Sequence, residues 1–127
     1  MRQVGVMACM GLYALENNVH RLHYDHKRAK KLEDGLRSMG FYIKEVDEDV
    51  VKTNIVFFGL PPSTTDCKND INMDDVCYKL AKEYGVEIGS GYGNHRQKLF
   101  RAVVHMDIDD DDIDRALDAL YKVCCRR

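Results

Sequence analysis

The sequence predicts an α+β domain in which helices pack on one face of a mostly antiparallel sheet of three or four strands. The apolar periodicity gives the element order helix, helix, strand, strand, helix, strand, strand, helix, with no internal repeat. The strands and helices do not alternate regularly, as they would in a parallel, doubly wound sheet. A chain of 127 residues is long enough for one such domain.

The first predicted helix covers residues 2–17 and has no polar face. It is rich in Ala, Met and Leu, and its apolar side chains point in all directions around the helical wheel. A helix that is apolar all round must be buried all round, and one small sheet can cover only one of its sides. We therefore expect residues 1–17 to pack against another domain and residues 18–127 to form the α+β domain.

The second predicted helix begins after Asn18, its expected N-cap, and ends at Gly40, which is expected in the left-handed conformation. Its apolar positions keep helical spacing: Leu22, Ala29, Leu32, Leu36 and Met39. Two strands are expected next, at residues 41–46 and 53–58, and the second, TNIVFF, is rich in β-branched and aromatic side chains. Residues 59–70 hold both prolines, which indicates a loop.

A third helix is expected after Asn72, which forms a capping box with Asp75, and this helix ends at Gly85. We expect residues 86–88 to form a short strand. The glycines that come next predict a flexible loop: Gly89, Gly91 and Gly93.

The last predicted strand, residues 99–106, carries the main candidate for binding. Alternate side chains of a strand point to opposite faces. One face therefore carries Arg101, Val103 and His105, and the other carries Phe100, Ala102, Val104 and Met106. Because the helices pack on the apolar face, Arg101 and His105 should point away from the core. A guanidinium pairs bidentately with a carboxylate, which suits recognition of an amino acid. On these residues alone, a solvated arginine that binds nothing is the simpler interpretation.

Two other clusters of polar residues have structural explanations. Three histidines, His20, His23 and His26, are spaced by three on the second helix, whereas a helical zinc pair normally has i, i+4 spacing. The acidic run at residues 107–114 lacks the glycine and glutamate of a calcium loop. Carboxylates cap helices and complement the helix dipole, so Asp109 is the expected cap of the final helix. No metal site is predicted.

Composition excludes several classes of partner and compartment. The net charge of −2 offers no electrostatic footprint for nucleic acid or an anionic membrane. The apolar run near the N-terminus is shorter than the roughly 20 residues that span a bilayer, and no clear signal-peptidase site follows it. The five cysteines are odd in number and show no CxxC spacing. They are typical of reduced thiols in a cytoplasmic protein.

Four stretches of the chain carry a further signal: MRQVGVMACMGLYALENNVHRL, DHKRAKKLEDGL, TNIVFF and RAVVHMDIDDDDIDRAL. In composition and order they resemble the C-terminal third of the L-threonine aldolase family, and the match is collinear over essentially the whole chain. The resemblance implies the small C-terminal domain of a fold-type I PLP enzyme. Complete members are lyases that cleave threonine or allo-threonine to glycine and acetaldehyde.

The resemblance also implies roles for individual residues. Arg101 matches the arginine that holds the α-carboxylate of the amino-acid substrate, and His105 matches a histidine that is expected to support the site. Arg2 matches an arginine near the cofactor phosphate. No catalytic residue is carried over to this chain. Complete members are expected to be homo-oligomers.

One departure from the family determines what this chain is expected to do alone. It starts at the methionine that follows the glycine run of complete members, so the large PLP-binding domain with its Schiff-base lysine is an expected partner. Lys98, the lysine nearest Arg101, lacks the small and hydroxylated neighbours expected of a Schiff-base lysine. We therefore expect no bound PLP and no activity from this chain alone. The alternative is a free-standing α+β module that binds a carboxylate or a protein without catalysis.

Overall fold

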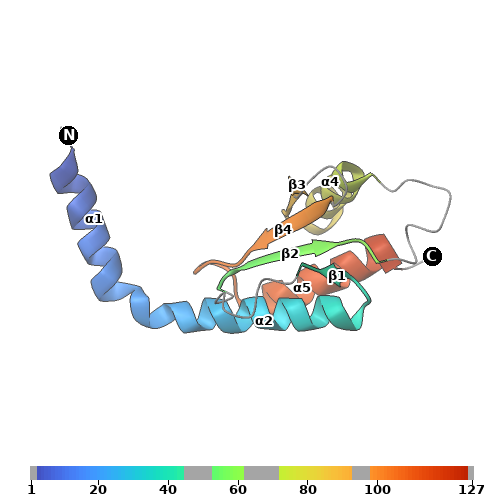
Figure 1. The fold of residues 1–127 in the computed structure, drawn as a ribbon, viewed down its shortest axis with the longest axis horizontal. Coiled ribbons are helices and arrows are strands. Elements are labelled where there is room, and N and C mark those ends of the chain that lie inside the picture. Colours follow the sequence, from blue (N-terminus) through green and yellow to red (C-terminus); the bar gives the residue numbers. More distant parts are fainter. Residues whose placement is uncertain (1–2, 45–52, 62–71, 93–97, 126–127) are drawn as a thin grey trace.

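The computed structural model describes residues 3–44, 53–61, 72–92 and 98–125. The order of elements is the predicted one (Figure 1). The elements are α1 (Val4–Asn17), the 3-10 turn η1 (Val19–Arg21), α2 (Leu22–Ser38), β1 (Tyr42–Ile43), β2 (Ile55–Gly59), α4 (Met73–Tyr84), β3 (Gly89–Tyr92), β4 (Leu99–Val103), α5 (Asp110–Leu120) and the π-helical end η2 (Tyr121–Cys125).

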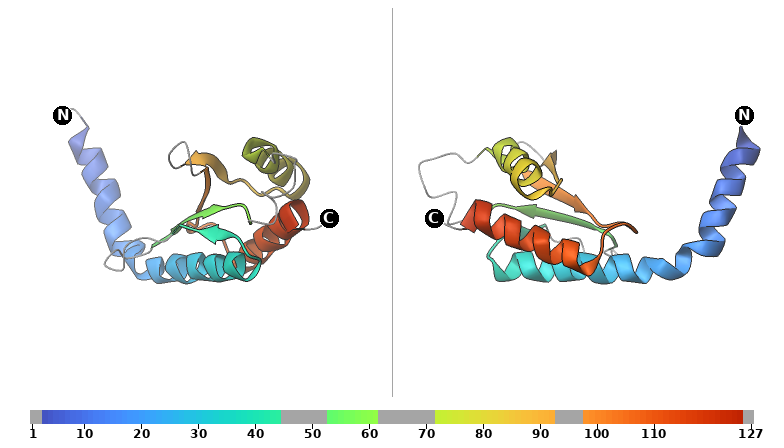
Figure 2. Two further views of the ribbon diagram at one scale, coloured as in Figure 1. Left: turned by 45° about the vertical axis from the view of Figure 1, so that its right-hand side comes forward. Right: turned by 180° about the vertical axis from the view of Figure 1, so that it is seen from behind.

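The four strands form one sheet in the order β1-β2-β4-β3, and all neighbouring pairs are antiparallel. The helices α2, α4 and α5 lie on one side of this sheet, as the two views of Figure 2 show. The side chains that the sheet turns toward them are buried, among them Val56, Phe58, Phe100 and Ala102. The predicted α+β class, with helices on one face of the sheet, is thus confirmed.

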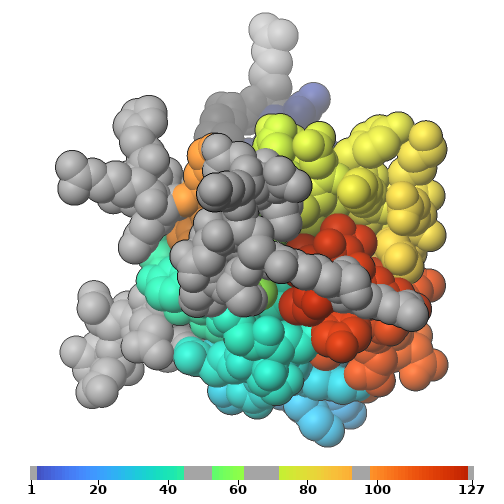
Figure 3. Space-filling model, turned by 90° about the vertical axis from the view of Figure 1, so that its right-hand side faces the viewer, coloured from blue at the N-terminus to red at the C-terminus, as the bar shows by residue number. Residues whose placement is uncertain are grey.

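Aromatic and aliphatic side chains fill the space between the sheet and the helices. Phe58 and Phe100 are fully buried, with ring centroids 5.2 Å apart, and Phe41 meets Phe58 edge to face at 5.8 Å. Leu36 of α2 and Leu120 of α5 complete this centre. Figure 3 looks onto the end of the body, where the last turn of α2 lies beside α5, and α4 lies on the other side of α5. The opposite face of the sheet is left without a covering helix in the described part of the chain.

Three of the predicted helix ends are confirmed. Gly40 has φ 83°, and the next amide, that of Phe41, donates to the carbonyl of Leu36, which closes α2. Gly85 ends α4 with φ 65°. Asp109 caps α5, and its carboxylate accepts from the backbone N–H of Asp112 in a reciprocal capping box.

The other two predicted caps need correction. Asn18 precedes the turn η1 and makes no side-chain cap bond, so α2 begins only at Leu22. Asn72 does cap α4, but its side chain accepts from the backbone N–H of Asp74, in place of the capping box predicted with Asp75.

The strand boundaries differ most from expectation at the third strand. Residues 86–88 are not a strand, and the glycine segment expected to be a loop supplies β3, Gly89–Tyr92. Glycine has low strand propensity, but an edge strand is held by backbone bonds to one neighbour, here β4. Gly93 lies outside the described residues.

The first and last strands are shorter than predicted. β1 comprises two residues, Tyr42 and Ile43, and residues 45–46 of the predicted strand lie outside the described part. β4 ends at Val103, not at Met106. There the Asn54 side-chain amide donates to the carbonyl of Val104, and the Val104 amide donates to the carbonyl of Asn54.

Helix α1 stands away from the rest of the molecule (Figures 1 and 2). None of its side chains is buried, and the large apolar ones are more than half exposed. These are Val4, Val6, Met7, Met10, Leu12, Tyr13 and Leu15. The helix has no acidic residue in its first turn and no basic residue in its last. Within the described ranges, no helix has both the length and the apolar character needed to cross a bilayer.

Candidate functional site

The open face of the sheet carries a row of residues that runs across β3, β4 and β2 and continues to Lys44, just past β1. Phe57 of β2 pairs with Arg101 of β4, and Arg101 pairs with Gly89 of β3. On the other side, the backbone N–H of Lys44, just past β1, donates to the carbonyl of Phe57 at 2.9 Å. The side chains in this row belong to the face that the helices leave uncovered, so the sequence-based prediction for the direction of Arg101 agrees with the register.

Arg101 is half-buried despite lying on the open face. Its guanidinium carbon lies 4.4 Å from the centroid of the Tyr92 ring, a stacked cation-π arrangement. Its Nε is buried and has no hydrogen-bond partner among the described residues. A ligand therefore reaches the guanidinium through its two terminal nitrogens and not through Nε.

The aromatic neighbours of Arg101 come from two different strands. Tyr92 packs edge to face on Phe57, with ring centroids 5.9 Å apart and planes at 65°. The register between β3 and β4 shifts between Gly89 and Tyr92, and Gly91 adopts φ 80° in this shift. Sequence analysis missed both rings. The alternation of TNIVFF could have placed Phe57 on the same face as Arg101, whereas nothing in the glycine segment signalled the position of Tyr92.

Two cations therefore share the open face. Besides Arg101, the Nζ of Lys44 lies 5.7 Å from the centroid of the Phe57 ring. A guanidinium offers parallel N–H groups that match a carboxylate, and a nearby ammonium adds positive potential. The arrangement can bind a carboxylate. The described part of the site contains neither a pair of carboxylates nor a nucleophile with an adjacent base.

His105, the second predicted site residue, is not brought into contact with Arg101. It follows the end of β4, and its Nδ1 accepts from the backbone N–H of Asp107 at 3.3 Å. The Asp107 carboxylate lies 3.6 Å from the same nitrogen. His105 is thus held in an exposed turn, and its supporting role stays a prediction. Arg2 lies outside the described residues, so its predicted place near a cofactor phosphate stays a prediction as well.

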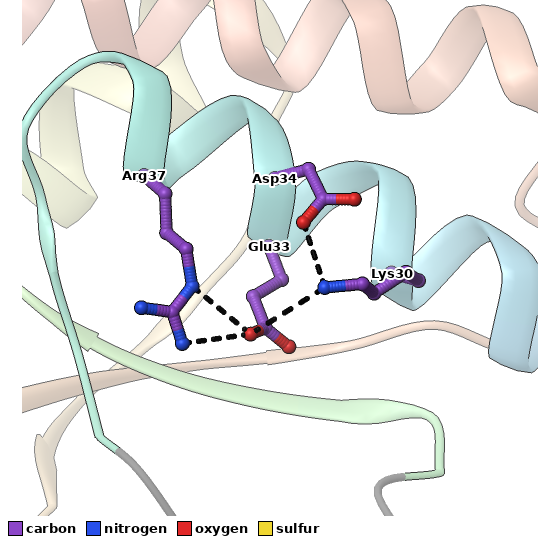
Figure 4. Close-up of polar contacts among 4 residues, drawn as sticks. All are labelled: Lys30, Glu33, Asp34 and Arg37. Carbon is purple, nitrogen blue, oxygen red and sulfur yellow. Dashed lines mark hydrogen bonds and ion pairs between the residues drawn. The ribbon is translucent and has the colours of Figure 1, made fainter.

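A second group of ionisable side chains lies on α2 (Figure 4). Glu33 is buried and accepts from Nε and Nη2 of Arg37, at 3.2 and 3.0 Å. Lys30 lies 3.9 Å from Glu33 and donates to Asp34 at 2.7 Å. These are i, i+3 and i, i+4 pairs along one helix, which compensate the burial of Glu33. We interpret the cluster as structural.

Two hollows lined by described residues do not include Arg101. A cavity of about 120 Å³ lies between α5, the end of β4 and residues 85–88, and its lining is mostly apolar. A smaller one of about 80 Å³ lies between α2 and the start of β2.

The histidines and acidic residues form no metal site within the part of the chain that the structure describes, since no three potential ligands gather there. The acidic run instead makes local bonds. Asp112 completes the α5 capping box and pairs with Arg115, and Asp114 pairs with Lys31 of α2.

The comparisons with known proteins agree with the resemblance seen in the sequence. A family model described as "Beta-eliminating lyase" matches residues 1–60. "Probable low-specificity L-threonine aldolase 2" from Arabidopsis thaliana is 30% identical over 125 residues, which is 97% of this chain and 31% of the relative. The "Low specificity L-threonine aldolase" of Escherichia coli is 42% identical over 57 residues, 45% of this chain and 16% of the relative.

The fold has a counterpart among solved structures. The crystal structure of alanine–glyoxylate aminotransferase from Nostoc sp. matches 88% of this chain and 28% of its own, with a TM-score of 0.67 and 19% identity. At that identity the likeness concerns the fold alone. The chain spans about a third of the length of the Arabidopsis aldolase. Over nearly all of its own length, this chain is a relative of the low-specificity L-threonine aldolases.

Proposed function

We propose that this chain is the small domain of a PLP-dependent threonine aldolase and that Arg101 binds the α-carboxylate of its amino-acid substrate. The reaction would be the cleavage of threonine or allo-threonine to glycine and acetaldehyde. The observation that carries the proposal is the guanidinium of Arg101, which is half-buried on the open sheet face and lies against the Tyr92 ring. The similarity to threonine aldolases supports the choice of reaction.

Arg101 would act by holding and orienting the substrate. Two parallel N–H···O bonds to a carboxylate fix its plane as well as its position, which a lysine in the same place would not do. Orientation matters because cleavage of one particular bond requires the substrate in one conformation. We propose that His105 supports this site from the turn after β4.

We infer that the described residues do not suffice to hold PLP. The lysine nearest to Arg101 in sequence, Lys98, is exposed, and the lysine that lines a hollow, Lys30, is paired with Asp34. A cofactor lysine needs an enclosed site that holds the ring beside it. We therefore propose that a large domain outside this sequence holds PLP, with Arg2 near its phosphate, and that this chain alone is inactive.

The exposed apolar helix supports a two-domain arrangement. We propose that α1, within residues 1–17, lies between the two domains, and that residues 18–127 form the small domain. Such a placement would cover the apolar side chains of α1 that the described body leaves exposed. We also propose homo-oligomeric assembly for the complete enzyme and, on the odd number of cysteines without CxxC spacing, a cytoplasmic location.

Carboxylate binding can be tested on the full chain with glycine as the probe. The chemical shift of the Arg101 side-chain N–H, followed by NMR during a glycine titration, reports the dissociation constant. Arg101→Gln, which removes the charge and the fork, is expected to weaken binding by about 10-fold or more. Arg115→Gln is the matched control, because Arg115 is an exposed arginine of α5 and pairs with Asp112. Equal binding by the Arg101→Gln variant and the wild type, judged by amide shifts near the site, would refute the proposal.

A second experiment tests whether this chain carries the lysine that binds PLP. Incubation of the chain with PLP and borohydride, followed by mass spectrometry, is expected to give no stoichiometric adduct on a single lysine. A specific adduct would mean that the chain carries its own cofactor lysine and would favour a self-sufficient enzyme.

A further inference from the structure

The ring of Tyr92 occupies a space that is free because residue 89 is a glycine. Its ring lies over Gly89, the residue that pairs with Arg101 across β3 and β4. A Cβ at position 89 would come within 2.9 Å of the ring carbon Cε2 and 3.3 Å of the hydroxyl oxygen of Tyr92. The ring therefore fills the space that a side chain at the register partner of Arg101 would otherwise take.

The contacts of Tyr92 fix the guanidinium of Arg101 from one side. The ring centroid is 4.4 Å from the Arg101 Cζ, and the same ring rests edge to face on Phe57 at 5.9 Å. Phe57 is itself the register partner of Arg101 on the other neighbouring strand. The guanidinium thus has an aromatic contact on one side, which limits its rotation and shields that side from water.

The buried Nε indicates which edge of the guanidinium remains for a ligand. Nε is buried without a hydrogen-bond partner among the described residues, and the two terminal nitrogens are not buried in that way. An arginine that is free in water must lose rotamer freedom when it binds, whereas one already held by a stacked ring loses less. Preorganisation of this kind raises affinity without adding a contact to the ligand.

We propose that Tyr92 is a positioning residue, whose ring, seated over Gly89, holds the Arg101 guanidinium so that its two terminal nitrogens pair end-on with a monocarboxylate. This inference rests on the proposed carboxylate-binding role of Arg101. The glycine-rich edge strand β3 thereby has a function in the site. Gly89 leaves room for the ring, and Tyr92 stacks on the guanidinium without contacting the carboxylate itself.

Three variants of the full chain test this arrangement, with glycine and acetate as the titrated probes. Tyr92→Ala removes the ring and is expected to raise the dissociation constant for both probes by about 3- to 10-fold. Tyr92→Phe keeps the π face and is expected to stay within about twofold of the wild type. Gly89→Ala keeps Tyr92 but displaces its ring, so it is expected to weaken binding as Tyr92→Ala does.

A second measurement separates positioning from general damage. Exchange of the Arg101 Nε–H with water is expected to be faster in Tyr92→Ala and Gly89→Ala than in the wild type and Tyr92→Phe, with unchanged far-UV circular dichroism. Tyr78→Ala is the matched control, because Tyr78 is an exposed tyrosine of α4 that also contacts a cation, the Nζ of Lys82 at 5.3 Å. It should alter neither the binding constant nor the exchange of the Arg101 proton.

The outcomes distinguish failure of this inference from failure of the proposed function. Wild-type affinity in both Tyr92→Ala and Gly89→Ala, together with lost binding in Arg101→Gln, would overturn the role of Tyr92 alone. Unchanged binding in Arg101→Gln would overturn the proposed function and this inference with it. Weakened binding in Tyr92→Phe to the level of Tyr92→Ala would also overturn the proposal, because the hydroxyl and not the stacked ring would then be responsible.

Discussion

At the scale of single residues, burial makes the thiols of Cys124 and Cys9 differ in reactivity. Burial raises the pKa of the Cys124 thiol to about 12, whereas Cys9 lies exposed on α1. Because the thiolate is the reacting form, iodoacetamide at mildly alkaline pH should label Cys9 at least about 10-fold faster than Cys124. Peptide mass spectrometry over a time course measures both rates. Equal rates in the folded chain would contradict the burial of Cys124.

The orientation of Arg101 was predictable, but its immediate surroundings were not. The period of two along residues 99–106 correctly assigned Arg101 to the face opposite Phe100, because burial of one strand face is a local property of the pattern. The stacking of Tyr92 depends on a register shift between two strands, which no single segment encodes. Only the folded sheet brings the Tyr92 ring to the guanidinium and Phe57 against that ring.

At the scale of elements, the cap of α5 makes stability depend on pH. The backbone N–H of Asp112, which donates to the carboxylate of Asp109, holds the pKa of that carboxyl below its ordinary 3.8. A lowered folded-state pKa stabilises the fold above 3.8, and this contribution is lost as the pH falls through the lower, folded-state value. Asp109→Asn keeps a capping oxygen but does not titrate. The difference in thermal midpoint between wild type and variant should therefore shrink in acid, and a constant difference would contradict the assignment.

Helix α2 contributes Ala29, Leu32 and Leu36 to the core, and Leu36 is fully buried. Leu36→Ala should lower the free energy of unfolding by about 2–5 kcal/mol, because it leaves a cavity beneath the sheet. Lys27→Ala on the exposed side of the same helix is the control, expected within about 0.5 kcal/mol of the wild type. Urea unfolding followed by circular dichroism measures both. A loss below about 1 kcal/mol for Leu36→Ala would show that the site collapses around the smaller side chain.

Among the elements, helices were easier to predict from sequence than edge strands. The glycines at 40 and 85 and the aspartate at 109 mark helix ends by local backbone chemistry, and all three were predicted correctly. β3 was predicted wrongly because its residues have poor strand propensity and its pairing with β4 is a tertiary effect. The cap expected at Asn18 was wrong because a 3-10 turn intervenes before α2.

At the scale of the whole molecule, the body should be stable without its first helix. No residue of α1 is buried, so removal of residues 1–17 should change the free energy of unfolding of the remaining chain by no more than about 0.5 kcal/mol. Urea unfolding monitored by tyrosine fluorescence compares the two chains. A fall of more than about 1 kcal/mol would mean that α1 supports the body directly.

The detachment of α1 also bears on how its helical form is maintained. A helix of 14 residues without tertiary packing is marginal in water, since nucleation is costly and few backbone bonds follow it. Its amides should consequently exchange with solvent much faster than those of α2, whose buried face is held by the sheet. Any partner that covers these apolar side chains must first offset the entropy lost on ordering them, so the segment would report its own occupancy by gaining hydrogen-exchange protection.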